Sequence, residues 1–231
     1  YRYQNQQKLK PFESAITLQQ HPDFVKAMAE VTGELPYDHP DQGLRFRLFG
    51  GQFLHNTSDM PGEYSFLLGN RFSGNNSPYT DFRDNQDYLY EHSLLDRGAR
   101  SGALGNQVWV NNGFLKAPTA FGNSTDWLLS ANLMTTIPGN TPLRLFADAG
   151  TSSTLVENDL REDLSYDAGA ALVLWQDVLE LYYPVVFSED LENVLDNNNV
   201  TGWDRLQFRL NIEPYKLLNL RQRIGSLRIF Q

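Results

Sequence analysis

The chain has 231 residues, of which 41% are apolar and 13% aromatic, and its formal net charge is −9. This length and apolar content fit one large domain and exclude wholesale disorder, while the negative charge argues against nucleic acid as a partner. The absence of cysteine excludes disulfides, thiolate metal sites and a cysteine nucleophile.

Alternation of apolar and polar residues, which is the period of a β-strand, recurs along most of the chain. It is clearest at residues 203–212, where every second residue is apolar. Residues 24–35 also permit a helix, but Glu30 and Glu34 lie opposite small residues, which favours a strand. The predicted strands begin at Phe12 and then cover residues 24–35, 43–54, 64–72, 105–115, 127–137, 143–151, 164–175, 178–187 and 203–212.

The connections between these strands alternate in length. Those after the sixth and eighth strands are short, whereas those after the seventh and ninth include an acidic loop at residues 152–163 and an Asp/Asn-rich loop at residues 188–202. Outer-membrane barrels have short periplasmic turns and longer outer loops. Residues 73–102 show no clear strand pattern and leave totals of eight or twelve strands open.

One face of the predicted strands is aliphatic and the other is charged. A dry sandwich core does not accept unpaired charges, whereas a membrane barrel has an apolar exterior and a polar interior. We therefore predict an all-β fold, a transmembrane antiparallel up-and-down β-barrel of about ten strands with a polar, plugged lumen; a soluble β-sandwich is the alternative. Residues 11–213 form this barrel, residues 1–10 are a periplasmic approach segment, and residues 214–231 form a basic amphipathic helix or an extended tail.

The charges on the polar face are nearly balanced in sign. We expect them to interlock and to fill the lumen instead of lining an open pore, with a proton or ion path as the alternative. The predicted lumen network consists of Glu13, Lys26, Glu30, Glu34, Arg45, Arg47, Arg71, Arg144, Asp148, Asp167, Glu180, Arg205 and Arg209. A predicted aromatic girdle at the membrane interfaces consists of Trp127, Tyr166, Trp175, Phe187 and Trp203.

No catalytic motif is evident. His21, His39, His55 and His92 form no HExxH pair, and GxSxG, P-loop and GxGxxG motifs do not occur. The acidic residues 189–196 lack the spacing of an EF-hand loop. We therefore predict no catalytic residue, cofactor or metal, and a barrel hydrolase with a rim histidine is the alternative.

Several runs resemble known outer-membrane barrels. LRLFADAG at residues 143–150, together with residues 166–169, 179–184 and 205–211, resembles the last strands of surface-antigen barrels of the outer-membrane insertase superfamily. LRFRLFGG at residues 44–51, with residues 87–90 and 113–114, resembles the C-terminal barrel of aminopeptidase-like zinc metallopeptidases from Bacteroidetes-type bacteria.

This resemblance implies a bacterial outer-membrane barrel that anchors a periplasmic metallopeptidase-like domain or a larger envelope complex. Its expected partners are the lipid bilayer and that domain or complex. The zinc motif is not in this sequence, so no catalytic residue carries over. An insertase-like or transport barrel is the alternative that the resemblance leaves open.

Overall fold

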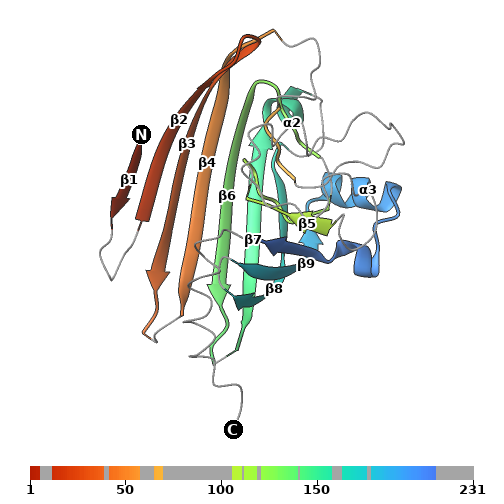
Figure 1. Ribbon diagram of the computed structural model, residues 1–231. Helices are drawn as coiled ribbons and strands as arrows, with labels where there is room; N and C mark the ends of the chain where they lie inside the picture. Colours follow the sequence, from red (N-terminus) through yellow and green to blue (C-terminus); the bar gives the residue numbers. More distant parts are fainter. Residues whose placement is uncertain are drawn as a thin grey trace.

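The computed structural model describes residues 1–5, 12–38, 42–57, 65–69, 106–110, 112–118, 121–139, 141–157, 163–175 and 178–211. Within these residues, ten strands form one mixed, mostly antiparallel sheet (Figure 1). The strands are β1 (Arg2–Asn5), β2 (Phe12–Gln20), β3 (Phe24–Pro36), β4 (Gly43–Asn56), β5 (Gln107–Val108), β6 (Trp127–Thr136), β7 (Leu143–Ser152), β8 (Ser165–Trp175), β9 (Leu179–Phe187) and β10 (Gln207–Leu210). The described helical elements are α2 (Ser153–Glu157), α3 (Glu189–Asn197) and the 3-10 turn η2 (Gly202–Arg205).

The strands follow a meander, in the order β1-β2-β3-β4-β6-β7-β8-β9-β10-β5. Strand β4 pairs directly with β6, although residues 57–126 separate them in sequence. Strand β5 is the exception to the meander, because it lies parallel to β10. The pairings among the described residues do not close the sheet, and Figure 1 shows the strands as a curved wall with β5, α2 and α3 on one side.

Alternation of side chains gives the sheet two distinct faces. In β7, the buried Phe146 and Asp148 flank the exposed Ala147, as expected for a strand in which successive side chains point to opposite sides. We call the side that packs against β5, α2 and α3 the covered face, and the opposite side the outer face. Every strand from β2 to β9 except β5 has at least nine residues.

Segments from the connection between β4 and β6 lie on the covered face. Residues 65–69 and 112–118 are joined by backbone hydrogen bonds, including one from the Gly113 N–H to the Leu67 carbonyl (2.7 Å). Together with residues 106–110 and 121–126, we call them the covering segments. They pack with the sheet and α3 in an apolar core whose buried members are Phe24, Phe49, Phe53, Phe66, Leu68, Leu115, Ala117, Leu128, Leu155, Phe187, Leu191 and Leu195.

Two glycines of the sheet make room for the covering segments. A Cβ atom on Gly51 would lie 2.7 Å from the ring of Phe66, and one on Gly150 would lie 2.3 Å from the Leu68 side chain. Neither separation is compatible with van der Waals contact, so only glycine lets these side chains pack onto the strands. The sheet and the covering segments are therefore complementary in shape.

The predicted β-rich fold is confirmed, with ten strands in one mostly antiparallel sheet. The choice of a strand over a helix at residues 24–35 is also confirmed, because β3 is continuous over Phe24–Pro36. None of the helices in the described part of the chain has both the length and the hydropathy that crossing a membrane requires.

Two predicted strands are wrong. In the described part of residues 64–72, only Phe66 forms a bridge, to Ser124. The described residues there are buried on all sides, which removes the alternation of a two-faced strand. The strand predicted at residues 105–115 shrinks to β5, because the chain leaves the extended conformation before Phe114, which has a positive φ of 57°.

Three regions predicted to lie outside the sheet or to be loops contain regular structure. Residues 1–10, predicted as an approach segment, include β1, which pairs with β2. The two predicted acidic loops contain α2 and α3. In α3, Leu191 and Leu195 are four residues apart and are buried in the core, while acidic residues occupy its first turn. The predicted C-terminal segment, residues 214–231, lies outside the described residues.

Candidate functional site

The charged side chains of strands β2 to β10 all belong to the covered face. Alternation along each strand and the register between neighbours place them on the same side as buried residues such as Asn132 and Tyr182. The predicted lumen residues that the structure brings onto this face are Glu13, Lys26, Glu30, Glu34, Arg45, Arg47, Arg144, Asp148, Asp167, Glu180 and Arg209. The covered face is therefore the candidate functional site.

Lys116, which comes from a covering segment, lies at the centre of one buried network. Its Nζ donates to both carboxyl oxygens of Asp148, at 3.0 and 2.9 Å, and to the carbonyl of Phe114 at 3.1 Å. The ammonium also lies over the rings of Phe114, Phe146 and Tyr182, with distances to the centroids of 3.8, 5.5 and 5.4 Å. Only 2% of Lys116 is exposed, so the ion pair with Asp148 is fully enclosed.

Asn132 on β6 connects this ion pair to a second one. Its side-chain amide donates to Asp148 (2.9 Å) and to the backbone carbonyl of Gly113 (3.0 Å). Its side-chain oxygen accepts from Arg47 Nη1 (3.0 Å), and Arg47 Nη2 donates to Glu30 (2.8 Å). One chain of contacts thus runs from β3 through β4 and β6 to β7, and such networks hold their members in a single arrangement.

Asp167 on β8 is directly opposite Asp148 on β7. It is buried, and burial together with the charge of Asp148 favours the neutral form of its carboxyl group. It lies close to Asp148, Lys116 and the backbone of Ala117. Two buried carboxyl groups therefore lie near one ammonium group, and Asp167 is the neutral one beside the ion pair of Lys116 and Asp148.

Glu180 on β9 lies at the centre of a second network. Its carboxylate accepts from Arg209 Nη1 (3.2 Å) and from the hydroxyl of Tyr182, and Arg45 lies 3.8 Å away. Strand pairing explains the contact with Arg209, since Arg209 on β10 is the register partner of Glu180. The two guanidinium groups compensate the charge of the buried carboxylate, and removal of one partner from such a buried pair is strongly destabilising.

Lys26 on β3 is held by aromatic rings. Its Nζ lies 5.3 Å from the centroid of Phe24 and 5.8 Å from those of Phe53 and Phe66. The last of these rings belongs to a covering segment. The cation is thus attracted by the ring faces at the boundary between the sheet and the covering segments.

Two members of the predicted network are placed differently. Arg205 is in η2 and not in a strand, because Gly202, with a φ of 51°, starts a 3-10 turn that delays β10 to Gln207. Its Nε donates to the Val200 carbonyl (3.2 Å), and its guanidinium lies over the ring of Phe187. Arg71 lies outside the described residues.

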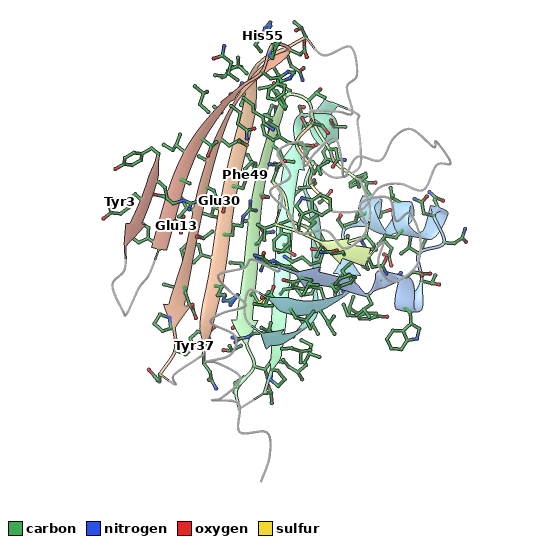
Figure 2. All side chains as sticks on the ribbon, in the orientation of Figure 1. Tyr3, Glu13, Glu30, Tyr37, Phe49 and His55 are labelled. Atoms are coloured by element: carbon green, nitrogen blue, oxygen red, sulfur yellow. The ribbon has the colours of Figure 1, made fainter. Side chains whose placement is uncertain are left out.

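The outer face carries no charged side chain in strands β2 to β10, as far as the structure describes them. Figure 2 shows all described side chains on the wall. The large apolar residues of these strands that are exposed are Phe12, Ile16, Leu18, Leu35, Leu48, Leu54, Leu129, Leu133, Leu143, Leu145, Tyr166, Leu174, Tyr183, Val185 and Val186. They extend over strands β2 to β4 and β6 to β9, with uncharged polar residues such as Gln52 among them.

The predicted aromatic girdle is found only in part on the outer face. Trp127 and Tyr166 belong to that face at the first or second residue of their strands. Trp203 is 83% exposed, but it lies in η2. The side chain of Trp175 is outside the described part of the chain.

The prediction for Phe187 is wrong, because its side chain is buried in the apolar core. The reason is a β-bulge: Ala168 pairs with Val186 and Gly169 with Pro184, so Val185 is an extra residue. One extra residue reverses the alternation of the following residues. Phe187 is consequently opposite Asp167 on the covered face.

Sequence reasoning missed three central residues, Lys116, Asn132 and Tyr182. Tyr182 is two residues after the buried Glu180 in β9, and Asn132 on β6 is the register partner of the buried Asp148 on β7. The period of two in each strand was therefore a signal that could have found them. Lys116 had no such signal, since it lies in a segment without a period. Among the described residues, no three His, Asp or Glu side chains are grouped as ligands for a metal.

Comparison of the sequence with models of protein families, with curated proteins and with solved structures gave no match.

Proposed function

We propose that this chain forms the wall and the plug of a non-conducting β-barrel in a bacterial outer membrane, and that the barrel anchors a periplasmic domain or an envelope complex. The observation that carries the proposal is the outer face, which is apolar over strands β2 to β9 and free of charge in its described part. Lipid hydrocarbon is the environment in which such a face is stable.

The size of this face supports a lipid environment over water. Monomeric soluble proteins rarely expose continuous apolar patches of more than a few hundred Å². Here the large side chains on the face include Leu48, Leu129 and Leu145, each about half exposed. The strands also suit a bilayer, because β2 to β9, apart from β5, have between 9 and 14 residues and about 9–11 are needed to span it.

The two ends of the sheet support an orientation. The strand ends at the end of the sheet marked by Tyr37 in Figure 2 are joined by connections that are short in sequence, residues 37–42, 137–142 and 176–178. The strand ends at the end marked by His55 are joined by the longer connections 57–126, 153–164 and 188–206, and by one short connection, residues 21–23 between β2 and β3. Short periplasmic and long external connections are usual in these barrels, so the Tyr37 end is assigned to the periplasm.

The filling of the covered face supports an anchor over a channel. Phe66 and Leu68 pack against the glycines of β4 and β7, and Lys116 is enclosed between β7 and β9. These groups occupy the space through which ions would pass. The resemblance of the sequence to barrels that follow metallopeptidase-like domains supports an anchoring role, and closure of the sheet around the covering segments is part of the proposal.

The experiment uses the absence of cysteine, which permits single spin labels without background changes. Labels are placed one at a time at residues 143–149 of β7, and the full chain is reconstituted in lipid vesicles. We expect labels at Leu145 and Ala147 to be accessible to oxygen and protected from a water-soluble nickel complex. Labels at Phe146 and Asp148 should be shielded from both. Accessibility of residues 145 and 147 to the nickel complex, equal to that of an exposed turn label at Pro138, would refute the proposal.

A further inference from the structure

The contacts of Lys116 show a cation site that the sheet supplies and a covering segment fills. Except for Phe114, the groups around its Nζ come from the sheet: the carboxylate of Asp148 on β7 and the rings of Phe146 on β7 and Tyr182 on β9. The ammonium comes from residues 112–118, which are not part of a strand. Carboxylate and aromatic faces together are the groups that bind ammonium ions in proteins.

Asp167 supplies a second, independent reason to regard this place as a cation site. Its carboxyl group is buried, is opposite Asp148 in the register of β7 and β8, and lies close to Lys116 and to the backbone of Ala117. Burial and the neighbouring charge of Asp148 favour the neutral form of Asp167, so Asp148 carries the negative charge and Asp167 adds a neutral oxygen acceptor to the site.

Side chains of the sheet also donate to backbone carbonyls of the segment. Arg47 and the hydroxyl of Ser130 donate to the Asn112 carbonyl at 2.9 and 3.1 Å, and Asn132 donates to that of Gly113. The side chains of Leu115 and Ala117 pack in the apolar core. The ammonium of Lys116 is therefore the charged side chain that this segment itself contributes to its described contacts with the sheet.

We propose that Asp148, Asp167 and the rings of Phe146 and Tyr182 form a binding site for primary ammonium ions, and that Lys116 is its tethered ligand. Occupation of the site by Lys116 holds residues 112–118 on the sheet and keeps the lumen filled. When the lysine side chain is removed, a free alkylammonium ion occupies the same site and restores the closed arrangement. The role in closing the lumen rests on the proposed function, whereas binding of the ion does not.

The test is chemical rescue with a thiol reporter. Ala117 is buried beside the site, so Ala117→Cys in the otherwise cysteine-free chain reports release of the segment through its rate of reaction with a water-soluble maleimide. We expect Lys116→Ala to raise this rate at least about tenfold, because Asp148 then lacks its counter-charge. n-Propylammonium, which replaces the atoms that the alanine variant lacks, should return the rate toward that of the parent.

Two controls separate charge and donor geometry from loss of packing. Lys116→Met keeps most of the side-chain volume without the charge; it should also react faster, but n-propylammonium should not rescue it because the space is filled. Sodium and tetramethylammonium chlorides at the same concentration, which lack N–H donors, should leave the rate of Lys116→Ala high. An unchanged rate in Lys116→Ala, or rescue by sodium equal to that by n-propylammonium, would overturn the inference.

Failure of this inference can be distinguished from failure of the proposed function. The same samples are tested for resistance to extraction from vesicles by carbonate. Resistance without rescue by n-propylammonium rejects the cation site and leaves the membrane wall standing. Rescue in detergent, combined with complete extraction from vesicles, supports the site and rejects the membrane wall.

Discussion

An arginine on the outer face should destabilise the protein according to its depth in the membrane. Leu48 lies near the middle of the 14-residue strand β4 and is 50% exposed, whereas Leu54 near its end is 61% exposed. The two positions are about 20 Å apart along the strand, or about 15 Å along the membrane normal at a tilt of roughly 40°. In an apolar band about 25 Å tall, Leu48 is therefore near the centre and Leu54 near an interface.

We expect Leu48→Arg to lower the free energy of unfolding from lipid vesicles by about 2–4 kcal/mol and Leu54→Arg by at most about 1 kcal/mol. Urea titrations followed by tryptophan fluorescence measure both values in the same vesicles. In a water-exposed sheet, neither surface substitution would change stability by more than about 0.5 kcal/mol. Equal effects of the two variants would therefore refute the assignment of the outer face to lipid.

Two further substitutions test the covered face. Gly51→Ala should reduce stability by about 1–3 kcal/mol, because its methyl group would meet the ring of Phe66. Gly50→Ala on the outer face should reduce stability less. Thermal unfolding of both variants compares the two losses, and equal losses would contradict the close fit of Phe66 on Gly51. Glu180→Gln should reduce stability by about 3–5 kcal/mol, because it removes a carboxylate, 1% exposed, whose negative charge compensates the partly buried guanidinium groups of Arg45 and Arg209. As a control, Glu13→Gln breaks an exposed ion pair and should reduce the free energy of unfolding by at most about 1 kcal/mol in the same urea titration. A smaller loss of stability for Glu180→Gln than for Glu13→Gln would contradict the role of the buried network.

The features of the fold that follow from local alternation could be predicted from the sequence. The period of two is enough to assign Arg47, Asp148 and Glu180 to one face, and these side chains do share the covered face. Alternation is local in sequence, so it can be recognised without knowing which strands pair. The strand at Phe24–Pro36 was predictable for the same reason.

Features that depend on distant contacts could not be predicted in this way. The bulge at Val185 reverses the alternation at Phe187, and nothing in the run of apolar residues around it marks the extra residue. Lys116 gains its partner from Asp148, which is 32 residues away, through a segment without a repeating pattern. The parallel pairing of β5 with β10 likewise joins residues about a hundred positions apart.

Because β4 pairs directly with β6, the sheet and the covering segments are structurally distinct parts of the fold. Strands β4 and β6 are neighbours in the sheet although residues 57–126 lie between them, and within those residues only β5 is a strand of the described sheet, so the length of the connection does not affect the register of β4 with β6. Closing a longer loop costs only about 0.6 kcal/mol for each doubling of its length. The sequence between β4 and β6 could therefore be replaced without changing how these two strands pair. A short hairpin turn there would leave the sheet without its covering segments, and a different insert would cover the same face of the sheet with other residues.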